Sequence, residues 1–138
     1  MPNPTHADGM LLMEYFKLWD TPFDGEAWTF FRKCREQGIF EDYASFTNAV
    51  PRASHEWALF DRVLCAFEQA AVLMRHGLMH PDLYFDIWPD PNRVWQRVEV
   101  VVHGLREDGD PRAYSGLEWL AARSADWRAA QSADPLQA

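Results

Sequence analysis

The sequence predicts an all-α fold, a single-domain bundle of six or seven helices around a central buried helix at about residues 55–76. Three observations lead to this prediction. Apolar residues recur at spacings of three and four along several segments, which is the period of one helix face. Residues that favour helix starts and stops separate these segments. No alternation of apolar and polar residues marks a strand.

The first predicted helix covers residues 10–19 and starts at Asp8 or Gly9. A second helix follows the N-cap Thr21, has a proline at its first position and ends at Gly38. Both segments carry an apolar stripe with helical spacing. The stripes consist of Leu12, Tyr15, Phe16 and Trp19 in the first helix and of Phe23, Ala27, Phe30, Phe31 and Cys34 in the second.

Basic residues gather near the end of the second predicted helix, at Arg32, Lys33 and Arg35. We expect them to complement the negative C-terminal end of the helix dipole. A short helix is predicted next at residues 41–48, and Pro51 ends that segment because proline cannot continue a helix.

The longest predicted helix begins at Arg52 or Ser54 and ends near His76, with Gly77 as its stop. Its polar residues are confined to pairs seven apart, and apolar residues occupy most of its circumference. Such a helix is expected to be enclosed by neighbours, with one narrow stripe in water. The core stripe is Trp57, Phe60, Val63, Leu64, Phe67, Ala71 and Met74, and the polar pairs are Asp61–Arg62, Glu68–Gln69 and Arg75–His76.

The stretch after this helix is rich in histidine, aspartate and proline and resembles a catalytic cluster at first sight. We interpret most of these residues as helix starts, because His80 and Asp90 are each followed by a proline at the first helical position. They predict a short helix at 82–88 and a longer one at 91–107.

The remainder of the chain is predicted to contain a turn at residues 108–111 and a last helix at residues 112–130. Nothing in the composition divides the chain, so residues 1–138 are expected to form one domain. Its ends, 1–8 and 131–138, are expected to fray.

The net charge of −8, of which residues 1–90 carry −7, makes nucleic-acid binding an unfavourable hypothesis, because acidic domains repel phosphate backbones. The sequence contains no run of 18 apolar residues, so no membrane span is predicted. The first residues lack the features of a signal peptide. The two cysteines, Cys34 and Cys65, fall on apolar helix faces and are interpreted as buried thiols. These features together predict a cytoplasmic protein.

Sequence motifs for catalysis, cofactors or metals are not found, so we expect no cofactor and no dedicated metal site. His76 and His80 are four apart, but a glycine and a proline interrupt the helix there. Cys34 lies near a helix C-terminal end, whose dipole disfavours a thiolate. Asp82 and Asp86 are spaced to form a carboxylate pair, although a solvated acidic face is the simpler interpretation.

Several large apolar and basic residues lie off the predicted core faces and define a candidate interaction surface. The arginines follow helical spacing on the 91–107 helix, where nearby glutamates are expected to neutralise part of their charge. The surface residues are Trp28, Trp119, Val100, Arg93, Arg97 and Arg106. A homodimer interface is the simplest function for them, and a wider core is the alternative.

Four segments of the chain carry a family resemblance: LWDTPFDGEAWTFFRKCRE, FEQAAVLMRHGLMHPDLYFDIW, NRVWQRVEVVVHGLRE and DPRAYSGLEWLAARSADWR. Their apolar pattern resembles an uncharacterised bacterial family of small helical domains, a domain of unknown function. Many of its members carry an N-terminal membrane anchor, and no such anchor is expected in this sequence. The resemblance implies an all-helical fold and carries over no activity, substrate or catalytic residue.

The leading functional hypothesis is a non-catalytic helical module that acts through protein–protein contacts and associates with itself. One alternative is an acidic inhibitor or immunity-type protein that binds a basic partner, because the first 90 residues are strongly acidic. Another is a small-ligand or metal-dependent enzyme with a site near residues 80–97. Its site residues would be His80, Asp82, Asp86 and Arg93.

Overall fold

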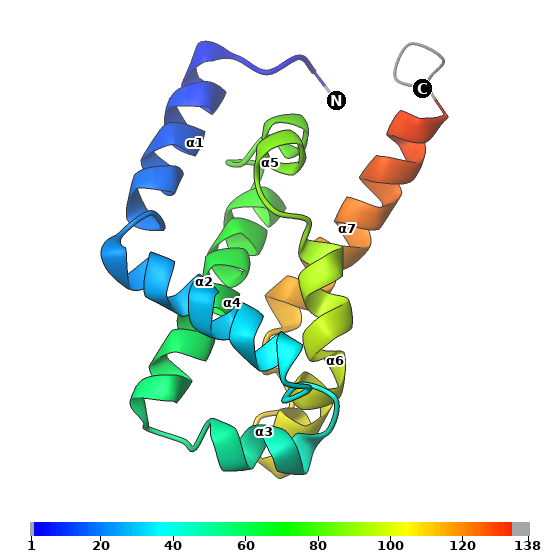
Figure 1. The fold of residues 1–138 in the computed structure, drawn as a ribbon. Coiled ribbons are helices and arrows are strands. Elements are labelled where there is room, and N and C mark those ends of the chain that lie inside the picture. The colour runs from blue at the N-terminus through cyan, green and yellow to red at the C-terminus, as the bar shows by residue number, and fades with distance from the viewer. Residues whose placement is uncertain (1, 134–138) are drawn as a thin grey trace.

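The computed structural model describes residues 2–133, which form seven α-helices and no strand (Figure 1). The predicted all-α bundle is therefore confirmed. Within this range no helix combines the length and the hydropathy that crossing a bilayer requires. The helices are α1 (His6–Leu18), α2 (Pro22–Glu36), α3 (Tyr43–Ala49), α4 (His55–Arg75), α5 (Pro81–Ile87), α6 (Pro91–Asp108) and α7 (Ser115–Ser132).

Helix α4 lies at the centre of the bundle, as predicted. It packs against α2 and α7, and α7 packs in turn against α6, while α3 and α5 fill the ends (Figure 1). Its enclosure is incomplete along one edge, where Val72 is 51% exposed. The buried residues of α4 are Leu59, Phe60, Val63, Leu64, Ala66, Phe67, Ala70 and Ala71.

Helix starts follow the sequence-based prediction except in α1 and α7. Thr21, Ser54, His80 and Asp90 are the observed N-caps of α2, α4, α5 and α6, and each side chain accepts a backbone N–H of the first turn. The predicted start of α1 at Asp8 or Gly9 is wrong. Its cap is Thr5, and Asp8 is the third helical residue that closes the capping box.

The last helix begins at Ser115, three residues later than predicted. Asp110 accepts a hydrogen bond from the amide of Arg112, so it shapes a turn instead of capping a helix. The N-cap is Tyr114, whose φ of 52° places it in the left-handed region and whose side chain makes no cap bond. Residues 111–114 therefore form a turn that changes the direction of the chain before α7.

The polar pairs of α4 are only partly the solvated stripe that the sequence predicted: Arg75 and His76 are exposed, but the other four residues bind distant segments. Arg62 Nε lies 2.6 Å from Asp24 Oδ1, and the same guanidinium lies 4.0 Å from the ring centroid of Trp19. Gln69 accepts the indole N–H of Trp19. Apolar periodicity cannot distinguish a polar residue in water from one that binds a distant segment. Arg62 and Gln69 therefore fasten the end of α1 and the start of α2 to the central helix, and Asp61 and Glu68 bind the start of α7.

Candidate functional site

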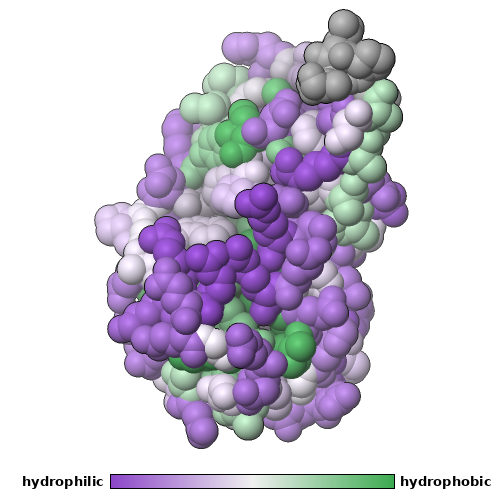
Figure 2. Space-filling view, turned by 45° about the vertical axis from the view of Figure 1, so that its right-hand side comes forward, coloured by the Kyte–Doolittle hydropathy of each residue, from purple (hydrophilic) through white to green (hydrophobic). Residues whose placement is uncertain are grey.

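The structure brings three of the six candidate surface residues together. Trp28, Arg93 and Arg97 line one cleft of about 310 Å³ between α2 and α6. Figure 2 views the side on which α6 comes forward, and it shows hydrophilic side chains gathered across the middle of this side. Two further arginines line the same cleft, Arg32 and Arg35. We call Arg32, Arg35, Arg93 and Arg97 together with Trp28 the arginine cleft.

Helical spacing explains why these side chains converge. On α2, Arg32 and Arg35 follow Trp28 by four and seven residues, so all three lie on one helix face. On the first turns of α6, Arg93 and Arg97 are four apart and share a face in the same way. The two faces border the same cleft, and residues 89–90, which lead from α5 into α6, line it as well.

The arginine cleft carries an excess of positive charge. Among the described residues, none of its four guanidinium groups forms an ion pair. The one acidic residue in its lining is Asp90, which already accepts hydrogen bonds from the Ser124 hydroxyl at 2.7 Å and the Asn92 amide at 2.9 Å. Asp90 also pairs with Arg128 at 3.2 Å. Its carboxylate is therefore engaged in capping α6 and joining it to α7.

The aromatic part of the cleft is held rigidly. The half-buried Trp28 ring packs edge-on against Phe31 and Phe67, with ring centroids 5.9 and 6.1 Å away. Guanidinium groups bind carboxylates and phosphates through paired hydrogen bonds, and they bind them more strongly beside an apolar surface than in open water. The arrangement can therefore hold an anionic group against an aromatic wall.

The other three candidate surface residues lie elsewhere. Arg106 is an internal brace: its Nε donates to the Ala113 carbonyl at 3.0 Å, and it pairs with Glu118 at 2.8 Å. Val100 is 50% exposed and lines a separate hollow beside α3. Trp119 lines a third pocket near the end of α4. These residues do not form one continuous face with the arginine cleft.

Sequence reasoning missed Arg32 and Arg35 as surface residues because it assigned them to the helix dipole. A signal was present nonetheless, since their spacing of four and seven from Trp28 predicts one shared face. What no spacing shows is that this face lies opposite the arginine pair of α6.

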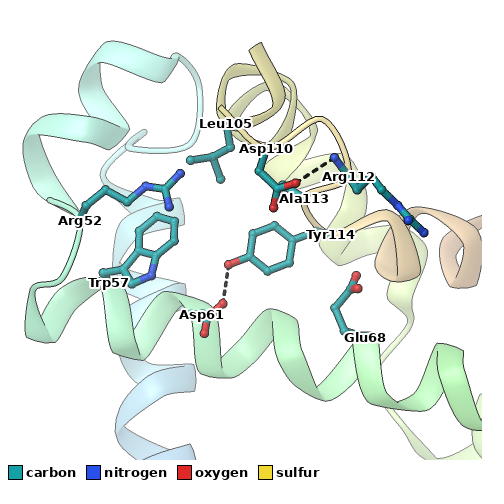
Figure 3. Close-up of a pocket in the computed structure, with 9 residues that line it drawn as sticks. All are labelled: Arg52, Trp57, Asp61, Glu68, Leu105, Asp110, Arg112, Ala113 and Tyr114. Atoms are coloured by element: carbon teal, nitrogen blue, oxygen red, sulfur yellow. Dashed lines mark hydrogen bonds between the residues drawn. The ribbon is translucent and has the colours of Figure 1, made fainter. Parts of the chain in front are cut away.

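A second polar pocket, of about 320 Å³, is shown in Figure 3. The Tyr114 hydroxyl points from the start of α7 toward α4 and donates to Asp61 at 2.6 Å. Burial and the neighbouring Asp61 raise the pKa of Tyr114. Burial also raises the pKa of Glu68, which accepts the Leu117 amide at 2.7 Å. Because these groups bind each other or the backbone, their role is to hold α7 on α4.

The residues of the enzyme hypothesis do not converge on one pocket. His80 lines the pocket near the end of α4, whereas Arg93 lines the arginine cleft. The His80 Nδ1 accepts the Asp82 amide, and its Nε2 lies 2.8 Å from the Pro2 carbonyl, so the ring is occupied as a cap. Asp82 accepts the indole N–H of Trp127 at 2.8 Å.

Neither thiol is arranged as a nucleophile. Burial raises the pKa of Cys34 to about 11, and burial together with Asp61 raises the pKa of Cys65 to about 12. A thiol with such a pKa is almost fully protonated near neutral pH. Within residues 2–133, no three histidine, cysteine or acidic side chains come together as a metal site requires.

Fold and cleft together define a small all-helical domain with a cationic, aromatic-walled cleft. The family described as Domain of unknown function (DUF4760) matches residues 13–124, which is most of the chain. The chain belongs to this family. Searches of curated proteins and of solved structures gave no match.

Proposed function

We propose that this domain is a non-catalytic protein-interaction module that binds an anionic group of its partner in the arginine cleft. One observation carries the proposal: four guanidinium groups without an ion pair to a described carboxylate surround Trp28 in a chain of net charge −8. Like charges gathered at one place oppose folding, so an acidic chain that keeps such a cluster has a use for it.

The partner's anionic groups are expected to be few and local. Fields from exposed charges are screened over about 8 Å at physiological ionic strength, so a short segment in the cleft responds mainly to the arginines. An extended nucleic acid or an anionic membrane surface would also be repelled by acidic residues outside the cleft, since the chain carries a net charge of −8. This comparison favours an acidic segment of a protein.

Self-association remains part of the proposal, because a second copy of this acidic chain is one source of carboxylates. A homodimer of this kind would place acidic residues of one copy in the arginine cleft of the other. We also propose a cytoplasmic location. The two free thiols, Cys34 and Cys65, fit a reducing compartment.

The test is a titration of fluorescently labelled hexaglutamate, followed by polarisation, on the wild type and on Arg32→Gln/Arg97→Gln. The matched control, Arg52→Gln/Arg112→Gln, removes the same charge from the pocket in Figure 3. We expect salt-sensitive binding that the cleft variant weakens by about 10-fold or more, because charged hydrogen bonds contribute about 1.5–3 kcal/mol each. The control should bind as the wild type does.

Equal binding by all three proteins, or no binding at low salt, would overturn the proposal. Light scattering over a concentration series decides whether the partner is a second copy. A dimer that the cleft variant dissociates and the control preserves supports self-association through this surface. A dimer that both variants preserve places the self-contact elsewhere.

A further inference from the structure

A second hollow, of about 420 Å³, adjoins the arginine cleft. Trp28 and Pro89 line both, so they form the wall that the two hollows share. The second hollow is mainly aromatic and apolar, in contrast to the first. Its other lining residues are Phe16, Trp19, Asp20, Asp24, Gly25, Ile87 and Trp88. We call this second hollow the aromatic groove.

The aromatic groove is a preformed apolar surface. The rings of Phe16 and Trp88 are stacked, with centroids 5.2 Å apart and an interplanar angle of 15°. At its edge Ile87 is 57% exposed, although it lies beside these rings. Exposed apolar surface beside a charged cluster is the usual composition of a binding site, where apolar anchors contribute most of the affinity.

The charges around the aromatic groove and the arginine cleft determine the orientation in which a ligand can bind. Asp24 is engaged by Arg62, but Asp20 is exposed. A ligand carboxylate is therefore repelled from the aromatic groove and attracted to the arginine cleft beyond Trp28. An apolar side chain meets the opposite preference, because only the aromatic groove offers it a surface to bury.

We propose that the two hollows act as one bipartite site for an acidic peptide segment. An aromatic or large aliphatic side chain of the partner enters the aromatic groove, and neighbouring carboxylates meet the four arginines across Trp28. This inference rests on the proposed function and specifies the partner's sequence chemistry: an apolar anchor next to a cluster of Asp or Glu. Such a segment buries apolar area and forms charge-assisted hydrogen bonds at the same time.

Gly25 supplies a sharp test, because it lines the aromatic groove and a Cβ built there meets nothing within 4 Å. Gly25→Leu should therefore fill the groove without disturbing the core. Leucine also has a higher helix propensity than glycine, so the variant should fold at least as well as the wild type. The matched control is Gly9→Leu on α1, where a Cβ is equally free.

The experiment compares three labelled peptides by polarisation: hexaglutamate, the same peptide preceded by Trp-Gly-Gly, and the Trp-Gly-Gly peptide with glutamine in place of glutamate. The anchored acidic peptide should bind about 10-fold more tightly than hexaglutamate, because burial of a large apolar side chain contributes about 1.5–3 kcal/mol. Gly25→Leu should reduce its affinity to that of hexaglutamate, and Gly9→Leu should leave it unchanged.

Each outcome separates the two proposals. If both acidic peptides bind equally, or if Gly25→Leu binds the anchored peptide as the wild type does, the bipartite site is overturned and the arginine cleft stands. If neither acidic peptide binds, both proposals fall. If the glutamine peptide binds as tightly as the anchored acidic one, the groove does not require acidic neighbours and the inference is wrong. Tighter binding to phosphatidylserine vesicles than to the anchored peptide would overturn the inference, because the ligand would then be an anionic membrane surface.

Discussion

Glu68 on α4 caps a different helix, α7: its Oε1 accepts the backbone amide of Leu117 at 2.7 Å. The local N-cap residue, Tyr114, makes no such bond. A Cβ on Gly116 would lie 2.8 Å from the Glu68 carboxylate, so the absence of a side chain there lets the two helices approach. Helix α7 therefore depends on α4 for its first turn.

Glu68→Ala should lower the free energy of unfolding by about 2 kcal/mol, because it removes the cap and leaves the backbone amide of the buried Leu117 without an acceptor. Glu68→Gln keeps an acceptor oxygen and should cost about 1 kcal/mol or less. Urea denaturation followed by circular dichroism measures both. Equal losses in the two variants would mean that the charge, and not the hydrogen bond, holds α7.

The pH dependence of stability should have opposite signs at two carboxylates. Burial raises the pKa of Glu68, so the folded protein binds the proton of this carboxyl group more tightly than the unfolded chain does. The stability that this group contributes therefore falls as pH rises from the pKa of an unfolded glutamate to the pKa in the folded protein. At Asp24, burial opposes ionisation, but bonds from Arg62 and Thr21 outweigh it and lower the pKa. The stability that Asp24 contributes is fully present above the pKa of an unfolded aspartate and is lost as pH falls through the lower pKa of the folded protein.

Urea titrations from about pH 3 to about pH 8 check both signs. The stability difference between wild type and Glu68→Gln should shrink as pH rises, whereas Asp24→Asn should flatten the loss of stability in acid. Glu14→Gln is the matched control, because its pair with Lys17 is exposed and contributes little. A control curve that changes as much as the Asp24 curve would contradict the assignment.

Gly104→Ala should destabilise the protein by about 1–3 kcal/mol, because a Cβ at this position of α6 would overlap the ring of Tyr43 on α3. Helix propensity alone predicts the opposite, a gain of about 1 kcal/mol. Gly9→Ala, where a Cβ meets nothing within 4 Å, should show that gain. Thermal unfolding of both variants is the measurement, and a stabilised Gly104→Ala would show that α3 can shift away from α6.

Ala53→Gly should raise stability by about 0.5 kcal/mol, because the alanine has a φ of 60° and a left-handed alanine costs about 1–2 kcal/mol, partly offset by the greater freedom of glycine when unfolded. Ala58→Gly, an equally exposed change inside α4, should lower stability by about 1 kcal/mol. Chemical denaturation of the pair tests this. The same sign in both variants would contradict the left-handed conformation of residue 53.

Both thiols should resist alkylation in the folded protein. Burial raises the pKa of Cys34 to about 11 and of Cys65 to about 12, so little thiolate is present near pH 8. Iodoacetamide labelling, followed by mass spectrometry, should be at least about 100-fold slower in buffer than in denaturing urea. Fast native labelling of either cysteine would show that its helix opens locally.

The helical bundle and its centre were predictable because capping residues and apolar spacing are local properties. Thr21, His80 and Asp90 cap the helices that the sequence assigned to them. The start of α7 was not predictable, since its cap comes from Glu68 on another helix. The polar stripe of α4 was misinterpreted for the same reason: Arg62 finds its partner only after α2 folds against α4.

The candidate site was predictable in part. Trp28, Arg93 and Arg97 were selected because they lie outside the predicted core faces of their helices, and the fold brings them into one cleft. The same reasoning included Arg106, whose charge is used internally by Glu118. Surface and internal arginines carry the same pattern in a sequence, so only the placement of α7 against α6 separates them.

The dependence of α7 on a carboxylate 49 positions earlier has a consequence for fragments of this chain. Peptides that cover α1 or α2 together with their N-caps contain complete capping boxes, which favour helix formation in the isolated segment. A peptide covering α7 leaves its cap behind and should be the least helical of the three for its length. Shortened versions that end before residue 115 would, conversely, expose to water both Glu68 and the apolar faces of α4 and α6 against which α7 packs, so we expect them to aggregate.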